Sequence, residues 1–351
     1  MSAIPNSHFT TLKGAYDTEK MEATLKVRRY DPETKRSRFD TFTVTIPVTA
    51  TVLDALDAIK DTHDGSLSYR KSCRMSVCGS CGMRIDGGAA LACKVPMRKF
   101  VEAGHVITVS PMGNLPVMKD LVVDMAPFWD KIRAVKPYLD TKNEAVPAKE
   151  WRIEPAHGDL IHKESLCILC GCCVSECNSM ESDPEFLGPA ALAKAYRFVG
   201  DARDMDTRER LRDLNGAHGI WDCTRCYFCN QRCPKGVDPR DAIAKLGAES
   251  FKEGFVRDEG ARHAKVFVDS TYKGGYLRET ELVPKTIGPA NAIKDIPFAL
   301  QLARAGKVPN PLSPHKAKDN DEVKRLWKLL EKEAKGQVRA RAINPEVVQE
   351  G

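Results

Sequence analysis

The placement of its cysteines constrains this chain more than any other feature of the sequence. All 13 cysteines fall into three short stretches, at residues 73–93, 167–177 and 223–233. No secretory leader precedes them, so we expect a reducing, cytoplasmic compartment, in which thiols are seldom paired as disulfides. Thiols gathered in this way are typical of metal ligands. The sequence therefore predicts three metal centres, and the spacing within each stretch indicates the metal.

The first stretch has the spacing of a two-iron centre. Its four cysteines are Cys73, Cys78, Cys81 and Cys93. A C-x4-C-x2-C run with a distant fourth cysteine is typical of plant-type [2Fe–2S] ferredoxins, and the x4 loop can wrap one edge of the flat cluster. Gly79 and Gly82 leave backbone N–H groups free to approach the sulfurs. A structural zinc site is the alternative, although zinc favours paired C-x2-C hooks.

The second and third stretches repeat one pattern, with spacings x2, x2 and x3, in the same register 56 residues apart. This is the bacterial ferredoxin run, in which three cysteines hold one cubane cluster and the fourth ligates the cluster of the other run. We therefore expect one [4Fe–4S] cluster on Cys167, Cys170, Cys173 and Cys233. A third cluster is expected on Cys177, Cys223 and Cys229, with Cys226 as its further ligand. Zinc remains the alternative metal here too.

Cys172 breaks the spacing of the second stretch, because its neighbour Cys173 already fills the ligand position. We interpret Cys172 as a small buried residue beside the cluster and not as a ligand.

Hydrophobic patterning predicts an α+β chain of three parts. Strand-like segments at residues 23–30 and 41–46, a helix capped by Thr51, and a strand at 106–110 surround the first cysteine stretch. By analogy this is a β-grasp ferredoxin domain, placed at residues 20–125. Helices predicted at 188–199 and from Asp238-Pro239 onward favour an α-helical domain with two cubane-type clusters at 126–247. Residues 248–351 then form a mostly helical or irregular extension that we expect to dock a partner.

The rest of the sequence offers no site for hydride or substrate chemistry. We find no dinucleotide-binding, Walker or nucleophile-elbow motif. His157 and His162 are interpreted as core or solvated residues. The net charge of +6 is small, which argues against nucleic-acid binding, and no apolar run reaches the length of a membrane span. A chain of one-electron centres without a catalytic pocket of its own predicts partner subunits at both ends.

With all three stretches in view, the chain resembles the iron–sulfur subunit of succinate dehydrogenase or fumarate reductase, over residues 23–247. The motifs that carry the resemblance are SCRMSVCGSCGM at 72–83, LACK at 91–94, CILCGCC at 167–173, GPAAL at 188–192, YRF at 196–198 and CPKGVDP at 233–239. The resemblance implies that electrons pass one at a time between the FAD of a flavoprotein subunit, where succinate and fumarate interconvert, and a membrane-side quinone module. It further implies a peripheral position on the cytoplasmic face of the membrane, held by those partners.

Two departures from the family pattern concern the third cluster. Most members have no cysteine at the position of Cys226 and carry a [3Fe–4S] cluster there, so Cys226 favours [4Fe–4S] over [3Fe–4S] in this chain. Most members also place a tryptophan and a histidine at the positions of Ser182 and Thr224, where both border the quinone. The resemblance therefore implies a quinone module of a different kind beside this cluster.

The C-terminal extension is similar, over residues 260–309, to the small iron–sulfur subunit of heterodisulfide reductases. That similarity implies a membrane-side partner that is cysteine-rich and heterodisulfide-reductase-like. Val323, Leu326, Trp327 and Leu330 form a helical stripe that we interpret as a packing face, with partner docking as the alternative.

Two other functions remain open from the sequence. The same clusters could serve a heterodisulfide-reductase-like or glycerol-3-phosphate dehydrogenase-like complex, although such relays usually lack the β-grasp domain. A zinc-stapled scaffold without redox function is the third reading. The direction of the reaction, toward succinate or toward fumarate, is not encoded in any motif that we find.

Overall fold

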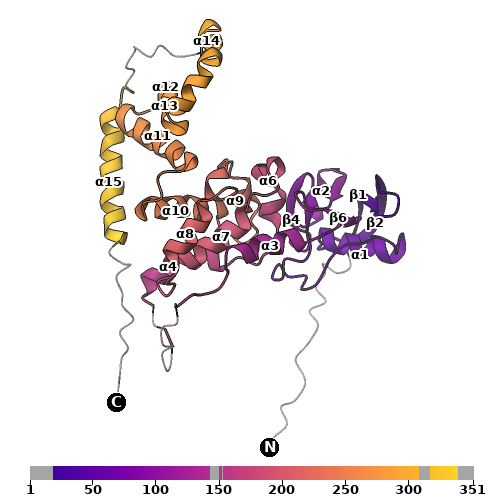
Figure 1. The fold of residues 1–351 in the computed structure, drawn as a ribbon. Coiled ribbons are helices and arrows are strands. Elements are labelled where there is room, and N and C mark those ends of the chain that lie inside the picture. Colours follow the sequence, from indigo (N-terminus) through magenta and orange to yellow (C-terminus); the bar gives the residue numbers. More distant parts are fainter. Residues whose placement is uncertain (1–18, 143–149, 152, 308–316, 339–351) are drawn as a thin grey trace, which may run out of the picture.

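The computed structural model describes residues 19–142, 150–151, 153–307 and 317–338. Within them a small β-rich unit leads into a helical body, and a helical arm projects from the far side of that body (Figure 1). Among the described residues, no helix has both the length and the apolar content needed to cross a membrane.

The N-terminal unit is a mixed five-stranded sheet packed against one main helix. Its elements in chain order are β1 (Lys20–Asp31), β2 (Arg36–Pro47), α1 (Val52–Thr62), β3 (Gly82–Ile85), β4 (Gly88–Leu91), α2 (Arg98–Glu102) and β5 (Ile107–Ser110), followed by the hairpin β6 (Val117–Lys119) and β7 (Val122–Val123). The strand order is β2-β1-β5-β3-β4, and β1 pairs antiparallel with β2 but parallel with β5. This arrangement is the expected β-grasp topology.

Local sequence explains these elements. Alternate side chains of β1, such as Leu25 and Val27, are fully buried, as a strand with one covered face requires. Thr51 caps α1, and its hydroxyl and the Asp54 carboxylate form a reciprocal capping box. Both predicted strands are longer than expected, because β1 and β2 pair over twelve positions each, out to the turn at Asp31. Cross-strand hydrogen bonds extend a strand into polar residues that sequence periodicity does not mark.

The helical body is built around the central helix α7 (Gly188–Val199). Its elements are α3 (Ala126–Ala134), α4 (Pro155–Ser165), α5 (Cys172–Ser175), α6 (Asn178–Ser182), α7 (Gly188–Val199), α8 (Thr207–Leu214), the 3-10 turn η2 (Ile220–Asp222), α9 (Phe228–Arg232) and α10 (Pro239–Lys252). The bounds of α7 and the start of α10 agree with the sequence prediction. Leu192 and Tyr196 of α7 are buried, as expected, whereas Phe198 is only partly covered.

The arm contains α11 (Glu259–Gly274), α12 (Glu279–Ile287), α13 (Pro289–Ala292), the 3-10 turn η3 (Ile293–Asp295), α14 (Ile296–Arg304) and α15 (Asn320–Val338). Gly260 of α11 lies directly against Trp221 of the body, and a Cβ added to Gly260 would lie 2.2 Å from the Cβ of Trp221. The Trp327 ring meets Tyr272 of α11 edge-on at 6.3 Å, but Leu326 and Leu330 of the same predicted stripe remain exposed. The packing-face prediction therefore fails for these two leucines.

Candidate metal centres

The loop between α1 and β3 wraps two of the first four cysteines in backbone donors. The N–H groups of Val77 and Cys78 each donate to Cys73 Sγ at 3.3 Å, and Met75 N–H donates to the same sulfur at 3.4 Å. Ser76 N–H donates to Cys93 Sγ at 3.3 Å. These donors stabilise negative charge on sulfur, so the loop is preorganised for thiolate ligands.

Two thiols of this loop, Cys78 and Cys81, lie in contrasting surroundings. Burial raises the pKa of Cys81 to about 12, whereas hydrogen bonds from the Ser80 side chain and nearby N–H groups lower the pKa of exposed Cys78 to about 6. Met75 and Val77 project from the loop into solvent. One edge of the loop therefore faces the protein, and the other presents apolar side chains outward.

The sequence repeat of the second and third stretches is also a repeat of backbone conformation. Leu169 and Arg225 occupy equivalent positions and have φ values of 57° and 56°. Gly171 and Tyr227, also equivalent, have φ values of 79° and 68° and immediately precede the short helices α5 and α9. Side chains other than glycine rarely adopt such values, so both runs are held in the same unusual turn.

Folding brings the last cysteine of each run beside the other run. Cys167, Cys170, Cys229 and Cys233 are all close enough to Cys173 to interact with it electrostatically. Those acting on Cys177 are Cys223 and Cys226, and Cys229 also faces Cys177, Cys223 and Cys226. Burial is the main cause that raises the pKa values of Cys173, Cys177 and Cys229. Thiols crowded into such surroundings can ionise together only with a cationic partner such as a metal ion.

Cys172 is fully buried and belongs to the core of the β-rich unit. A hydrogen bond with Cys172 lowers the pKa of Cys170 to about 7, and the same bond together with burial strongly raises the pKa of Cys172. Cys172 is therefore a protonated thiol that donates toward the Cys170 sulfur. The buried position agrees with the sequence interpretation, whereas the contact with the β-rich unit was not predicted.

Two glycines of the first loop touch the second run. A Cβ on Gly79 would lie 2.7 Å from Cys170 Cβ, and a Cβ on Gly82 would lie 3.0 Å from the Cys170 carbonyl oxygen. Gly79 also has a φ of 75°, which favours glycine. The two cysteine stretches are therefore in direct backbone contact, and side chains larger than glycine would separate them. Sequence spacing gave no signal for this contact.

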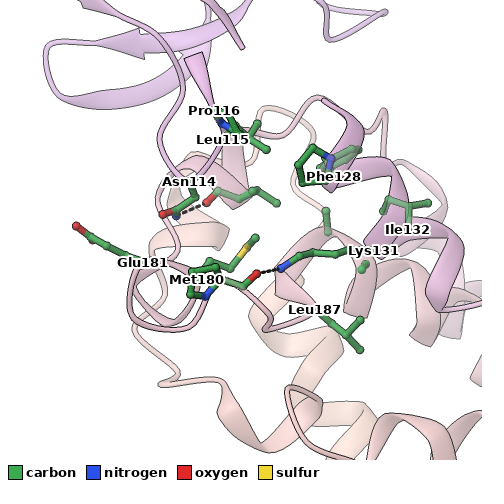
Figure 2. A pocket seen from close by; sticks show the side chains of 14 residues that line it. Asn114, Leu115, Pro116, Phe128, Lys131, Ile132, Met180, Glu181 and Leu187 are labelled. Carbon is green, nitrogen blue, oxygen red and sulfur yellow. Dashed lines mark hydrogen bonds between the residues drawn. The ribbon is translucent and has the colours of Figure 1, made fainter. Parts of the chain in front are cut away.

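A cavity of about 380 Å³ lies between the β-rich unit and the helical body, near Cys177 (Figure 2). Its walls are mainly apolar, and Asn114, Lys131 and Glu181 are the polar residues among its lining. The Asn114 amide donates to the carbonyl oxygens of Val174 at 2.8 Å and of Cys177 at 2.9 Å. The Lys131 ammonium donates to the carbonyl oxygens of Pro184, at 2.5 Å, and of Phe186. Asn114 and Lys131 thus bind backbone and fix the walls of the cavity.

The two positions at which the sequence departs from the family pattern near the expected third cluster are exposed. Ser182 and Thr224 both face solvent, and the Thr224 N–H donates to Ser179 Oγ at 3.2 Å. His157 is buried and His162 exposed, in agreement with the sequence interpretation of the two histidines. A carboxylate–histidine group that the sequence did not reveal lies nearby, formed by Asp183, His218 and Asp222.

This group gives a testable dependence of stability on pH. The Asp183 carboxylate, 2.7 Å from His218 Nδ1, raises the pKa of His218 above its ordinary value of 6.5. A raised folded-state pKa stabilises the fold fully below pH 6.5, and this contribution is lost as the pH rises through the folded-state value. In anaerobic denaturant titrations, the stability advantage of the wild type over His218→Gln should shrink from pH 6 to pH 9. An advantage that stayed constant across this range would contradict the assignment.

Comparison with known proteins agrees with this geometry. Residues 24–130 match the family of 2Fe-2S iron-sulfur cluster binding domains, and residues 164–237 match 4Fe-4S dicluster domains. The chain is 40% identical over 242 residues to the fumarate reductase iron-sulfur subunit of Haemophilus influenzae, covering 65% of this chain and 93% of that one. The chain belongs to this family of iron–sulfur subunits.

Relatives named for the reverse reaction also match this chain. A mitochondrial succinate dehydrogenase iron-sulfur subunit of Oryza sativa is 41% identical over 205 residues, which cover 57% of this chain and 72% of that one. The Mycobacterium smegmatis Sdh1 complex in its apo form contains a chain that superposes with a TM-score of 0.59 at 25% identity, covering 68% of this chain and 98% of that one. The chain is thus an iron–sulfur subunit with a [2Fe–2S] domain and a dicluster domain, and about a third of its length lies outside these matches.

Proposed function

We propose that the chain is the electron relay between a flavoprotein and a membrane-side quinone module in a succinate dehydrogenase or fumarate reductase complex. Its clusters, when bound, accept and release single electrons. The ligands that we propose are Cys73, Cys78, Cys81 and Cys93 for [2Fe–2S], Cys167, Cys170, Cys173 and Cys233 for [4Fe–4S], and Cys177, Cys223, Cys226 and Cys229 for the third cluster. The observation that carries this assignment is the exchange of Cys177 and Cys233 between the runs. The functional parts are 20–125, 126–247 and 248–351.

Contacts between the three cysteine groups support a linear order. Gly79 and Gly82 bring the first loop against Cys170, and Cys173 lies within electrostatic range of Cys229. The second group is therefore in contact with both others, which supports passage from [2Fe–2S] through [4Fe–4S] to the third cluster. Two further contacts link the β-rich unit to the helical body and so support this order. Lys94 donates to the Pro234 carbonyl at 3.1 Å, and Arg84 pairs with Glu176 at 3.1 Å.

The two ends of this order are exposed and apolar, as docking ends should be. Met75 and Val77 surround the first group, and Tyr227 and Phe228 follow exposed Cys226 at the third. The first end would receive the FAD-containing subunit. The second would face the membrane-side partner, for which the resemblance of residues 260–309 favours a cysteine-rich, heterodisulfide-reductase-like subunit. We place the relay on the cytoplasmic face of the membrane.

We propose a [4Fe–4S] cluster at the third site. Cys226 stands 56 residues after Cys170, in the equivalent backbone turn, and Cys177 and Cys229 both lie within electrostatic range of it. A site with four thiols in this arrangement fits a cubane, whereas [3Fe–4S] needs only three. The exposed polar residues Ser182 and Thr224 support a quinone module that differs from that of most family members.

The test is anaerobic purification with the native partners, followed by an iron count and low-temperature EPR. We expect about ten irons per chain, from one two-iron and two four-iron clusters, and reduction of all three by succinate. Clusters that were reduced by glycerol 3-phosphate or a dithiol but not by succinate would favour the heterodisulfide-reductase-like or glycerol-3-phosphate dehydrogenase-like relay. Bound zinc without a paramagnetic cluster in either redox state would refute any electron relay.

A further inference from the structure

The tip of the arm exposes apolar side chains that nothing in the described part of the chain covers. The helix α14 lies at the far end of the arm, away from the body (Figure 1). Ile293, Ile296, Phe298 and Leu300 are 64%, 49%, 62% and 53% exposed, respectively. Helices of soluble proteins normally bury such residues, so these side chains are expected to be covered in the working complex.

The charge of the same segment indicates what covers it. Residues 288–307 contain the basic residues Lys294, Arg304 and Lys307 but a single acidic residue, Asp295, so their net charge is +2. Lys294, Arg304 and Lys307 form no ion pair with any described residue.

We propose that the arm tip, residues 288–307, inserts into an anionic lipid surface. Lys294 precedes the apolar helix α14, Arg304 is its last residue and Lys307 follows it, so basic side chains stand at both ends of an apolar stretch. Such helices lie in the membrane interface with their apolar side chains below the headgroups and their basic side chains at the phosphates. The family resemblance places a membrane near this subunit only through its partners; here the chain itself contacts lipid.

A second helix of the arm provides a matched control. On α15, Leu326 and Leu330 are 60% and 58% exposed, which is comparable to Phe298 and Leu300. Its five basic residues, however, are mixed with four acidic ones, Asp321, Glu322, Glu331 and Glu333, so its net charge is only +1. Apolar exposure beside charges that nearly cancel should support binding to anionic lipid far less, so α15 helps to separate the two contributions.

The experiment is vesicle flotation of the full-length chain, purified anaerobically. We expect binding to phosphatidylcholine vesicles that contain phosphatidylglycerol, and much weaker binding to phosphatidylcholine alone. Replacing Lys294, Arg304 and Lys307 together by glutamine should weaken partitioning about a hundredfold, at about fivefold per charge. Phe298→Ser with Leu300→Ser should weaken it at least about tenfold. The control variants, Leu326→Ser with Leu330→Ser and Lys324→Gln with Arg325→Gln and Lys328→Gln, should bind like the wild type.

Three results would overturn the proposal: no flotation of the wild type, equal flotation with neutral and anionic vesicles, or an equal loss in the α15 variants. Retention of partner subunits that depended on Phe298 and Leu300, without any vesicle binding, would show a protein interface instead. An unchanged circular dichroism spectrum and iron content would show that the variants are folded. Flotation requires no electron transfer, so this test and that of the proposed relay fail independently.

Discussion

Replacing Cys226 by alanine is expected to lower the iron content from about ten to about nine per chain and to create a [3Fe–4S] EPR signal in the oxidised protein. The physical reason is that a cubane held by three thiolates readily loses its unligated iron, and only Cys177, Cys223 and Cys229 would remain. Removal of one thiolate also removes negative charge, so the reduction potential of the third cluster should rise. The measurements are an iron assay, EPR of the oxidised sample and a redox titration under strict anaerobiosis.

Cys172→Ala is the matched control, because Cys172 is the one cysteine that we exclude as a ligand. It should keep about ten irons and give no [3Fe–4S] signal. Loss of its hydrogen bond to Cys170 should instead lower the potential of the [4Fe–4S] cluster slightly, since a donor to a ligand sulfur stabilises the reduced cluster. If the wild type already shows the [3Fe–4S] signal and Cys226→Ala changes nothing, Cys226 is not a ligand.

Arg210→Met is expected to destabilise the helical body by about 3–5 kcal/mol, because it leaves a buried carboxylate without its partner. Arg210 on α8 donates two hydrogen bonds to the Asp204 carboxylate, from Nε at 3.0 Å and from Nη2 at 2.8 Å. The Arg210 side chain is only 2% exposed and that of Asp204 is 0% exposed. Arg210 also donates to the carbonyl oxygens of Lys136 at 2.6 Å and Tyr138 at 2.7 Å, beyond the end of α3. Anaerobic urea unfolding followed by circular dichroism measures the loss.

Two further variants make this result interpretable. Arg212→Met, on the same helix, removes an arginine that is 63% exposed and pairs with Glu209, and it should cost less than about 1 kcal/mol. Adding Asp204→Leu to Arg210→Met should restore part of the lost stability, since no unpaired buried charge then remains. Equal losses in Arg210→Met and Arg212→Met would show that the buried pair is not special.

Several elements followed directly from local sequence. The bounds of α7 agree with the prediction because its apolar residues recur at the helical period, and Thr51 caps α1 because its neighbour Asp54 completes a capping box. The β-grasp topology and the helical dicluster unit were also predicted correctly. The long pairing of β1 with β2 and the solvent exposure of Leu326 and Leu330 were not, because both depend on what lies opposite each residue.

The cofactor chemistry of this protein was predictable from local sequence. Metal ligation by a loop depends on the number of residues between ligands, so the spacings of three cysteine stretches were enough to predict three iron–sulfur sites and an electron-transfer subunit. How the cysteine stretches contact one another depends on the tertiary structure. Gly79 contacts Cys170, which is far from it in the sequence, and Cys172 packs in the core of the β-rich unit. The apolar side chains at the tip of the arm, in contrast, are exposed. Both the contacts and the exposure arise from packing between elements, and no local pattern encodes them.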